Sequence, residues 1–393
     1  MRAAEGVAPL RRSPPEPAPT TAEPRPLRIA FLDSWKATAH EGSGTAVGIA
    51  LLAEGLEELG HSVDLVSPRP GRGILLAHRI AFNASLERRL ARGPAYDLLV
   101  GFDVDGVFLH LNGRRDTRFV LCLKGVAADE SRFASGTDHL ALSILARLEA
   151  QNARGADRVL VPSRYSAGVA VEQYRIPPSS IGVVPEPIRL AEWDALRDRS
   201  PAPDGPPTIL SVARQYPRKD TATLLRAMAI LRREMPEARL RVIGGGPELG
   251  RLRALARKLR LEEAVTLEGA VPDSDEVRRA YLQSDVFCLP SLQEGFGIVF
   301  LEAMAAGLPV VAARAGATPE VVLHGRTGHL VHPGDHEELA AALALMLSNP
   351  AAARRMGRAG RARVEEFTLD RVCRRFLAEA RGGSAAPAVE EAG

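Results

Sequence analysis

The sequence predicts an α/β fold of two doubly wound domains, and three observations support this prediction. Short apolar runs alternate with longer segments of helical spacing from residue 27 onward, as expected for parallel sheets covered by helices. A proline-rich break at 200–207 interrupts the pattern, which then restarts. The 393 residues, 46% of them hydrophobic and 25% charged, provide enough apolar side chains for two cores.

The first domain is expected over residues 27–200. Its expected strands are short apolar runs at 27–32, 63–66, 97–100, 119–123 and 158–161. Segments of helical spacing lie between them at 45–59, where Gly60 is a stop signal, at 73–92 and at 138–154. This alternation predicts a mostly parallel sheet with helices on both faces.

The second domain is expected over residues 208–365, after a linker at 201–207. Its expected strands lie at 208–213, 240–243, 265–267, 286–289, 309–312 and 329–331, with helices between them. We expect a helix at 366–381 to cross back to the first domain, and disordered tails at 1–26 and 382–393. Two such domains facing one another would bind ligands at a cleft outside the carboxyl ends of their strands.

Composition argues against several classes of protein. The 51 Lys and Arg residues against 48 Asp and Glu leave a net charge of +3, too small for a dedicated nucleic-acid binder. The cysteines Cys122, Cys288 and Cys373 are few and far apart, which argues against disulfides and favours a reducing, cytoplasmic location. No run of 18 apolar residues predicts a membrane-spanning helix, and residues 1–26 lack the apolar core of a signal peptide.

The segment Pro290–Pro309 is the most informative in the chain. It follows an expected strand, turns at Gly295 and Gly297, and continues into a helix that ends at Gly307. Glycines at such a turn let backbone amides approach a ligand, and a helix N-terminus favours phosphate. Glu302 stands in an apolar part of this helix and needs a hydrogen-bond partner, for which ribose hydroxyls are suitable. Capping or pairing with a nearby Arg is the alternative.

Glu294 and Glu302 are eight residues apart and enclose a Gly-Phe-Gly sequence directly after a strand. With this spacing the segment resembles the signature of glycosyltransferase family 4, whose members are retaining enzymes of the GT-B fold. The resemblance extends over residues 27–376 and is most specific from residue 209 onward. It implies two Rossmann-like domains facing a central cleft, with a nucleotide sugar on the second domain and the acceptor against the first.

A second motif, Ser211–Asp220, supports this resemblance. Arg214 and Lys219 match an Arg and a Lys that family members carry at this spacing after the first strand of the second domain. Two fixed cations at a strand end can bind a diphosphate, the Arg as a planar fork and the Lys as a point charge. A solvated charged loop is the alternative for such a pair considered alone.

The resemblance implies roles for individual residues. Arg214 and Lys219 would stabilise the leaving diphosphate, Glu294 and the turn backbone would orient the donor sugar, and Glu302 would hold the ribose. Arg214, Lys219 and Glu294 are therefore the candidate catalytic residues. The candidate donor-binding residues are Gly42, Ser43, Gly44, Val271, Gly295, Phe296, Gly297, Ile298 and Glu302.

Three other segments resemble family motifs less specifically. The glycine-rich turn in Val242–Glu248 either contacts ligand or only starts a helix. The segment Ala315–Glu320 resembles the usual Gly-Gly-x-Pro-Glu, with Ala at one glycine position. The Gly-Ser-Gly at 42–44 would lie against the donor. A dinucleotide fingerprint is the alternative for these glycines, but they come nine residues after Asp33 rather than directly after the strand.

The chain departs from the family pattern at two positions. Many relatives carry a His after the fourth strand of the first domain, where this chain has Lys124. The usual Asn-Gly-Val-Asp after the strand near residue 184 is here Pro185–Ile188. Proton handling at Lys124 therefore differs from that implied by the resemblance.

Asp103 and Asp105 form a D-x-D sequence like the metal motif of the other glycosyltransferase fold. Because they follow a strand of the first domain, we interpret them as cleft-lining or structural, and we expect no metal. The candidate residues on the acceptor side of the cleft are Lys124, Asp105 and Asp129.

Residues 72–92 combine arginines with apolar side chains in the pattern of a basic amphipathic helix, which can lie on anionic lipid. We favour an ordinary packed helix with a solvated face, and keep a weak peripheral membrane contact as the alternative.

The expected function is metal-independent hexosyl transfer, with retention, from a UDP- or GDP-linked sugar to an unidentified sugar, lipid or small-molecule acceptor. The nucleotide sugar is a substrate, and no cofactor is expected. A non-catalytic nucleotide-sugar binder and an NAD(P)-dependent oxidoreductase are the two alternatives.

Overall fold

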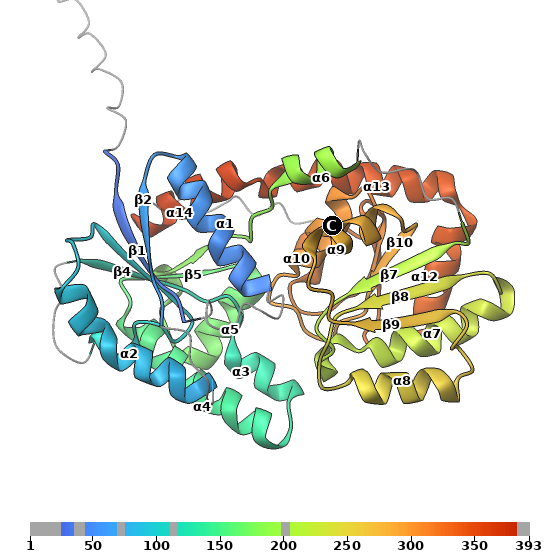
Figure 1. Ribbon diagram of the computed structural model, residues 1–393, viewed down its shortest axis with the longest axis horizontal. Helices are drawn as coiled ribbons and strands as arrows, with labels where there is room; N and C mark the ends of the chain where they lie inside the picture. The colour runs from blue at the N-terminus through green and yellow to red at the C-terminus, as the bar shows by residue number, and fades with distance from the viewer. Residues whose placement is uncertain (1–24, 35–43, 69–74, 111–116, 198–204, 383–393) are drawn as a thin grey trace, which may run out of the picture.

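The computed structural model describes residues 25–34, 44–68, 75–110, 117–197 and 205–382, which form two α/β lobes side by side (Figure 1). Most of the expected tails and the first part of the expected linker lie outside these residues. Both lobes contain a parallel sheet between layers of helices, so the predicted fold class is confirmed.

The first lobe contains a six-stranded sheet in the order β2-β1-β3-β4-β5-β6. Its strands are β1 (Arg28–Leu32), β2 (Ser62–Val66), β3 (Leu98–Phe102), β4 (Arg118–Cys122), β5 (Arg158–Val161) and β6 (Ile181–Val183). The helices α2 (Leu75–Ala91), α4 (Gly136–Gly155) and α5 (Arg164–Tyr174) share one apolar core with the sheet. The other face packs against α1 (Gly44–Glu58) and α14 (Leu369–Ala380). A short helix, α3 (Ala127–Glu130), follows β4.

The second lobe contains a six-stranded sheet in the order β12-β11-β10-β7-β8-β9. Its strands are β7 (Thr208–Val212), β8 (Arg239–Ile243), β9 (Val265–Gly269), β10 (Val286–Leu289), β11 (Val310–Ala313) and β12 (Gly328–Val331). One face packs against α7 (Thr221–Glu234), α8 (Leu249–Lys258) and α12 (His336–Ser348). The opposite core includes α6 (Leu190–Arg197), α9 (Ser274–Leu282), α10 (Ile298–Ala305) and the end of α13 (Pro350–Val364).

The backbone passes between the lobes at two neighbouring places. The amide of Ile188 donates to the carbonyl of Phe367 at 2.9 Å, and Ile188 pairs with Thr368 in a parallel bridge. Helix α6 follows the first passage and packs in the second lobe, where Trp193 meets Tyr281 edge to face at 5.5 Å. The packing boundary therefore precedes α6, whereas the expected domain boundary was residue 200.

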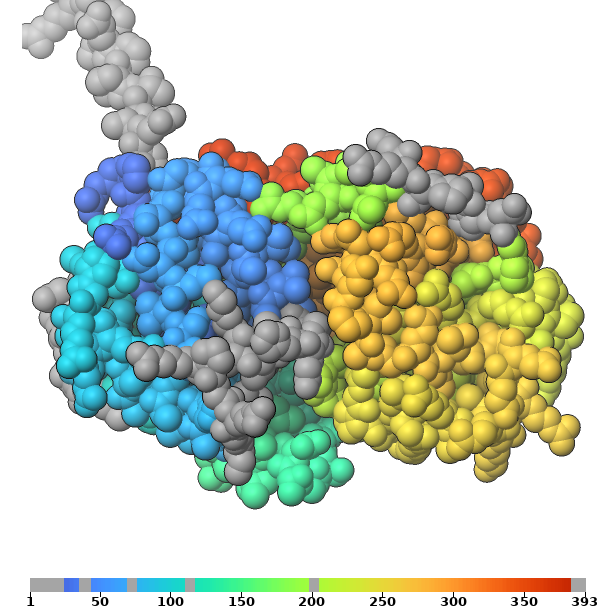
Figure 2. Space-filling view, viewed as in Figure 1, coloured from blue at the N-terminus to red at the C-terminus, as the bar shows by residue number. Residues whose placement is uncertain are grey.

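The second passage leads to α14, which packs on the sheet of the first lobe. Val372, Cys373 and Phe376 are at most 1% exposed and belong to the same core as Ile29 and Phe31. Helices α13 and α14 therefore run along one side of the molecule over both lobes (Figures 1 and 2).

Helix α2 covers most of the segment considered as a membrane-surface helix. Phe82 and Leu86 are buried in the first lobe, while Ile80 is 40% exposed. Arg79 is also buried, and its Nε donates to the Ser34 hydroxyl at 2.9 Å. The inner side of this helix is thus an ordinary packed face. None of the helices in the described ranges has both the length and the apolar character needed to cross a bilayer.

Candidate active site

The strand order of the second sheet locates a binding site before any side chain is considered. Chain connections run from β7 outward to β8 on one side, and from β10 outward to β11 on the other. The loops after β7 and β10 therefore part at the carboxyl edge of the sheet, which is where doubly wound sheets bind ligands. These two loops carry Arg214–Lys219 and Glu294–Gly297, the segments singled out by sequence.

Lys219 and Glu294 contact each other at this switch point. The Lys219 Nζ lies 2.5 Å from the Glu294 Oε1, and the two side chains are 12% and 6% exposed. The loops are also joined through their backbones, because the Leu292 amide donates to the Arg218 carbonyl at 2.8 Å. A buried cation and a buried carboxylate thus form one unit at the end of the sheet.

Burial and pairing act in opposite directions on these two groups. Burial is the largest influence on Lys219 and lowers its pKa below the ordinary value, despite the attraction of Glu294. Burial alone would raise the pKa of Glu294, but Lys219 and Arg218 outweigh it and lower this pKa. Glu294 is therefore a carboxylate at neutral pH, able to accept hydrogen bonds from ligand hydroxyls.

The turn at 295–297 leads directly into α10. Gly297 has φ +95°, and a β-carbon there would lie 2.5 Å from the ring of Phe300, so the position requires glycine. The ring of Phe296 packs inward against Phe367 at 5.8 Å. Phe296, a candidate donor-binding residue, can therefore contact a ligand only through its backbone. The first amides of α10 begin at Ile298 and have no partner within the helix itself.

Helix α1 approaches the same place from the first lobe. A β-carbon at Gly44, its first residue, would lie 3.8 Å from the Ile298 Cδ1. The N-termini of α1 and α10 therefore converge from the two lobes, and both carry the positive end of a helix dipole. This geometry suits a doubly charged anion between them. Gly42 and Ser43 lie outside the described residues.

Glu302 lies one turn into α10, where the Tyr281 hydroxyl donates to its Oε2 at 2.7 Å. Burial raises the pKa of Glu302, and the Tyr281 hydrogen bond opposes this shift. The hydrogen-bond partner of Glu302 is thus a tyrosine; the charge of Arg278 also opposes the rise in this pKa, but its ion pairs are with Glu192 and Asp275. Val271 packs at the edge of the same core.

Two buried acceptors near Glu294 have no hydrogen-bond partner among the described residues. They are the Gln293 Oε1 and the Thr318 Oγ1, in side chains that are 2% and 1% exposed. Gln293 precedes Glu294 in sequence, and Thr318 follows Ala317, whose amide donates to the Glu294 carbonyl at 2.9 Å. Buried polar atoms are normally satisfied, so these two atoms are exceptions next to Glu294.

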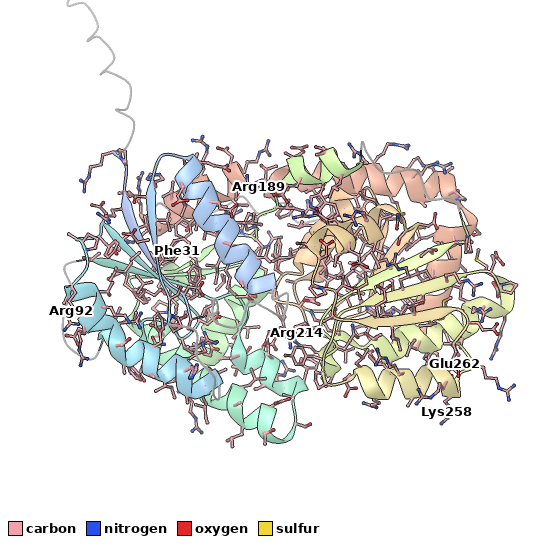
Figure 3. The ribbon with its side chains drawn as sticks, in the orientation of Figure 1. Phe31, Arg92, Arg189, Arg214, Lys258 and Glu262 are labelled. Carbon is pink, nitrogen blue, oxygen red and sulfur yellow. The ribbon has the colours of Figure 1, made fainter. Side chains whose placement is uncertain are left out.

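Arg214 lies at the boundary between the lobes (Figure 3). Its guanidinium stands over the Tyr216 ring, 5.4 Å from the ring centre. The neighbouring Arg218, which sequence analysis did not select, pairs with Glu130 of the first lobe at 3.2 Å. The loop after β7 therefore carries three cations toward the cleft rather than two.

On the first lobe, Lys124 pairs with Glu186. Glu186 belongs to Pro185–Ile188, the second segment that departs from the family pattern. The Lys124 Nζ donates to both carboxylate oxygens of Glu186, at 2.9 and 2.8 Å, and the side chains are 9% and 6% exposed. Gly48 of α1 makes room for this pair, because a β-carbon there would lie 2.4 Å from the Glu186 Oε2. The ion pair thus lies in a notch on the second turn of α1.

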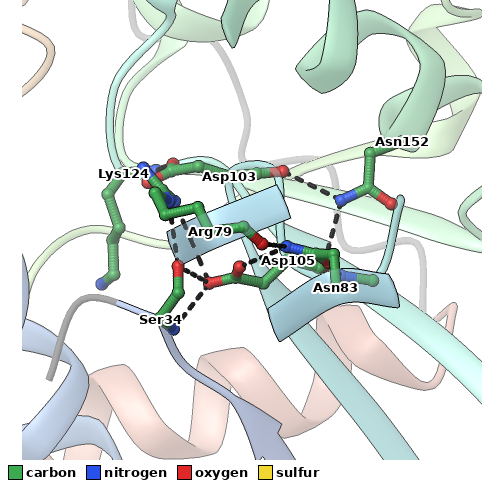
Figure 4. A network of polar contacts seen from close by, with 8 residues as sticks. Ser34, Arg79, Asn83, Asp103, Asp105, Lys124 and Asn152 are labelled. Atoms are coloured by element: carbon green, nitrogen blue, oxygen red, sulfur yellow. Dashed lines mark hydrogen bonds and ion pairs between the residues drawn. The ribbon is translucent and has the colours of Figure 1, made fainter. Parts of the chain in front are cut away.

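Asp105 belongs to an internal network rather than to the surface of the cleft (Figure 4). Its Oδ2 accepts from the amide and the hydroxyl of Ser34, both at 2.8 Å, and its Oδ1 accepts from Asn83 at 3.0 Å. Burial raises the pKa of Asp105 to about 6, against the effect of Arg79 and these hydrogen bonds. Of the two interpretations of the D-x-D sequence, the contacts of Asp105 favour the structural one.

The network joins the loops at the switch point of the first sheet, after β1 and β3. Asp103 adopts φ +55°, and its Oδ1 accepts from the Lys124 amide at 2.8 Å. Asn152 of α4 donates to the carbonyls of Asp103 and Asp105. Ser34 after β1 and Lys124 after β4 are thereby both fixed to the loop after β3, the strand that lies between them in the sheet.

Asp129 is 2% exposed and accepts from the Tyr165 hydroxyl at 2.7 Å, and it pairs with Arg132 at 3.2 Å. Its carboxylate is therefore already bound by the first lobe. The candidate residues thus divide into a donor-side group around Lys219 and Glu294, and first-lobe residues that mainly hold loops. Sequence reasoning missed Arg218 and Glu186, although Glu186 stood within a noted departure from the pattern.

Two family models match the chain. One, described as Glycosyltransferase Family 4, matches residues 42–192, and the other, described as Glycosyl transferases group 1, matches residues 193–363. The two matches are adjacent and together cover residues 42–363, which leaves β1 and α14 outside. Their boundary lies within α6, close to the first passage between the lobes.

Curated relatives match over parts of their length. A GDP-mannose-dependent alpha-(1-6)-phosphatidylinositol monomannoside mannosyltransferase of Mycolicibacterium smegmatis is 38% identical over 180 residues, 44% of this chain and 45% of that protein. A D-inositol 3-phosphate glycosyltransferase of Segniliparus rotundus is 32% identical over 252 residues, 61% of this chain and 56% of that protein. The chain thus spans about half the length of the curated relatives it matches.

Solved structures share the fold over most of the chain. A sucrose-phosphate synthase from Thermosynechococcus elongatus has a TM-score of 0.76 at 22% identity, covering 90% of this chain and 98% of that one. HepE of Anabaena, in complex with UDP and glucose, has a TM-score of 0.68 at 20% identity, covering 89% and 98%. Both likenesses concern the arrangement of the two lobes.

Proposed function

The chain belongs to glycosyltransferase family 4, and on this premise we propose that it transfers a hexose from a nucleoside-diphosphate donor to an acceptor hydroxyl. The observation that carries the proposal is the buried pair of Lys219 and Glu294 at the switch point of the second sheet. A donor of this class has an anionic half and a hydroxyl-rich half. The ammonium suits the first half and the carboxylate suits the second.

The main task of the chain's residues is to stabilise the leaving group. When the bond between the anomeric carbon and the phosphate oxygen breaks, negative charge collects on the diphosphate. Lys219, Arg214 and the first amides of α10 would stabilise that charge. The N-terminus of α1, which lies close to that of α10, would stabilise it further. Glu294 would hold the sugar hydroxyls, and Glu302 would hold the ribose.

We propose transfer with retention. The acceptor oxygen forms its bond to the anomeric carbon on the face that the diphosphate leaves, and the departing phosphate oxygen takes the acceptor proton. No side-chain nucleophile takes part in this step. Independence of metal ions and a cytoplasmic location belong to the same proposal.

The names of similar proteins suggest which donors and acceptors to test first. The mannosyltransferase of M. smegmatis is described as GDP-mannose-dependent, and HepE was solved with UDP and glucose. GDP-mannose and UDP-glucose are therefore the first donors. D-inositol 3-phosphate and phosphatidylinositol monomannoside are the first acceptors, because the two curated names include these compounds.

The test measures donor binding and then turnover in wild type and in Lys219→Ala. Saturating donor should raise the midpoint of thermal unfolding of the wild type, with the same shift in EDTA. Lys219→Ala should lower the rate of nucleoside-diphosphate release by about 100-fold, because a preorganised cation facing the developing charge is lost. Lys258→Ala is the control, since this exposed lysine lies at the far end of the second lobe (Figure 3). Full activity in Lys219→Ala would refute the diphosphate assignment.

A non-catalytic nucleotide-sugar binder is the second candidate function. One observation favours it: Lys124, at the position of the family's His, is already bound to Glu186 by two hydrogen bonds. Such a protein would show the thermal shift with donor but would release no free nucleoside diphosphate with any acceptor. Release above the rate without protein excludes this candidate.

A further inference from the structure

The segment Ala315–Glu320, which resembles a family motif, has no role in the function proposed above. Its last residue, Glu320, lies on α11 (Thr318–Val321) of the second lobe, but its carboxylate contacts the first lobe. The Oε2 accepts from the Arg164 amide at 2.8 Å, and the Oε1 accepts from the Tyr165 amide at 2.7 Å. Glu320 thus caps the N-terminus of α5 across the boundary between the lobes.

The same turn of α5 contacts the donor-side turn. The hydroxyls of Ser163 and Ser166 donate to the carbonyl of Gly295, at 2.7 and 3.0 Å. Both serines are at most 2% exposed, and the Ser163 Oγ also accepts from the Ser166 amide at 3.0 Å. Gly295 directly follows Glu294, so the first lobe holds the backbone next to the carboxylate assigned to the donor sugar.

The other end of the segment 315–320 holds Glu294 itself. The Ala317 amide donates to the Glu294 carbonyl at 2.9 Å, and Gly316 packs so closely that a β-carbon would lie 2.5 Å from that oxygen. The contacts therefore form a closed circuit: Glu294 and Gly295 touch Ala317 on one side and α5 on the other, and Glu320 joins α5 to the segment 315–320.

From this circuit we propose that Glu320 is a positioning residue of the donor site. The inference rests on the proposed function and deepens it, because it names what sets the orientation of the sugar-facing carboxylate. Glu320 acts through α5, whose serine hydroxyls fix the Gly295 carbonyl, and it touches neither half of the donor. The two lobes must be in contact for the circuit to close, so the sugar subsite is complete only when they are.

The proposal predicts an effect confined to the sugar half of the donor. In Glu320→Gln the charge is lost and an amide N–H faces α5, while Lys219 and the α10 N-terminus are unchanged. GDP-mannose or UDP-glucose, whichever the wild type binds, should bind about 10-fold more weakly, as expected for loss of a charge-assisted hydrogen bond. The matching nucleoside diphosphate should bind within about twofold of wild type. Ser163→Ala with Ser166→Ala should reproduce this pattern.

Asp335→Asn is the matched control. Asp335 also caps a helix with one carboxylate, accepting from the amides of Glu337 and Glu338 at 3.0 and 2.9 Å, but within the second lobe. It should leave both affinities unchanged. Equal weakening of nucleoside diphosphate and nucleotide sugar in Glu320→Gln, or no weakening, would overturn the proposal.

Hydrogen exchange without ligand distinguishes this inference from the proposed function. Glu320→Gln should accelerate exchange of amides in both 163–168 and 292–296, whereas Asp335→Asn should change neither segment. Acceleration in 163–168 alone would show that α5 does not hold the donor turn, and would overturn the inference. If the wild type binds no nucleotide but both segments respond, the coupling stands and the assigned donor is wrong.

Discussion

At the scale of residues, the pair of Lys124 and Glu186 shows how two departures from a family pattern can be explained together. They are 62 positions apart in sequence, yet each is the other's hydrogen-bond partner, and both are nearly buried. A buried ion pair is costly to break, because the remaining charge loses its solvent without gaining a partner. Each departure thus requires the other.

We expect Lys124→Met alone to lower the free energy of unfolding by about 3–5 kcal/mol, because it leaves the Glu186 carboxylate buried and unpaired. The double variant Lys124→Met, Glu186→Met should recover most of this loss, since two apolar side chains of similar size replace the pair. Urea denaturation of the wild type, both single variants and the double variant gives the coupling energy. Additive losses would show that the two residues act independently.

Motifs of fixed spacing pointed to residues that the structure brings together, whereas partners that are distant in sequence were not found. Lys219 and Glu294 were selected separately, each from its own motif, and the structure brings them to 2.5 Å. Their roles remain predictions. Glu186 could not be paired with Lys124 from one sequence, because nothing local in either segment indicates the other. Phe296 was selected for its place in the turn, but the spacing of residues along the sequence does not show that its ring packs into the core.

At the scale of elements, the donor turn depends on a second turn packed against it. Gly316 has φ +56° and lies against the backbone of Glu294. A side chain there meets two obstacles, the left-handed backbone and the neighbouring carbonyl. The turn after β11 therefore supports the turn after β10 from outside the site.

Gly316→Ala should lower the affinity for the nucleotide-sugar donor by about 10-fold, because the Glu294 backbone must shift to relieve the contact. Gly334→Ala is a matched control: its φ is +79°, and no described atom lies within 4 Å of a β-carbon there. Both variants carry the strain of a left-handed Ala, of order 1–2 kcal/mol. Donor titration of the two variants isolates the effect of the contact; equal affinities would contradict it.

The existence of elements was more predictable than their partners. The strands expected at 158–161 and 286–289 have these bounds in β5 and β10, since apolar runs at sheet centres are continuous. The short β6 was expected only as a strand near residue 184, without bounds; it has three residues, and only Gly182 is buried. Residues 190–197 were assigned to the first domain because they precede the proline-rich break, but they form α6, whose Trp193 packs in the second lobe.

At the scale of the whole molecule, the last described helix completes the first lobe. Helix α14 packs so closely on α1 that a β-carbon at Gly55 would lie 2.5 Å from the Cys373 Sγ. Phe376 is fully buried in the core that also contains Phe31 and Val100. The first lobe therefore depends on residues more than 180 positions beyond its last strand.

Phe376→Ala should destabilise the protein by about 3–5 kcal/mol, as large-to-small changes of buried aromatics do. The loss should fall on the first lobe, so hydrogen exchange should rise in β1 and β3 more than in β7 and β10. Arg374→Ala on the exposed side of the same helix is the control, since its partner is Asp370 of α14 itself. Uniform acceleration over both lobes would show that they unfold as one unit.

The position of α14 has a consequence for synthesis on the ribosome. While the chain emerges, the sheet of the first lobe forms with one face only partly covered by α1, and it remains so until residues 369–380 have left the exit tunnel. The second lobe, from β7 to α13, is translated in the meantime and can finish folding first. The apolar face of the first strands thus stays partly uncovered until α14 has been synthesised, and during that interval it is a surface prone to aggregation.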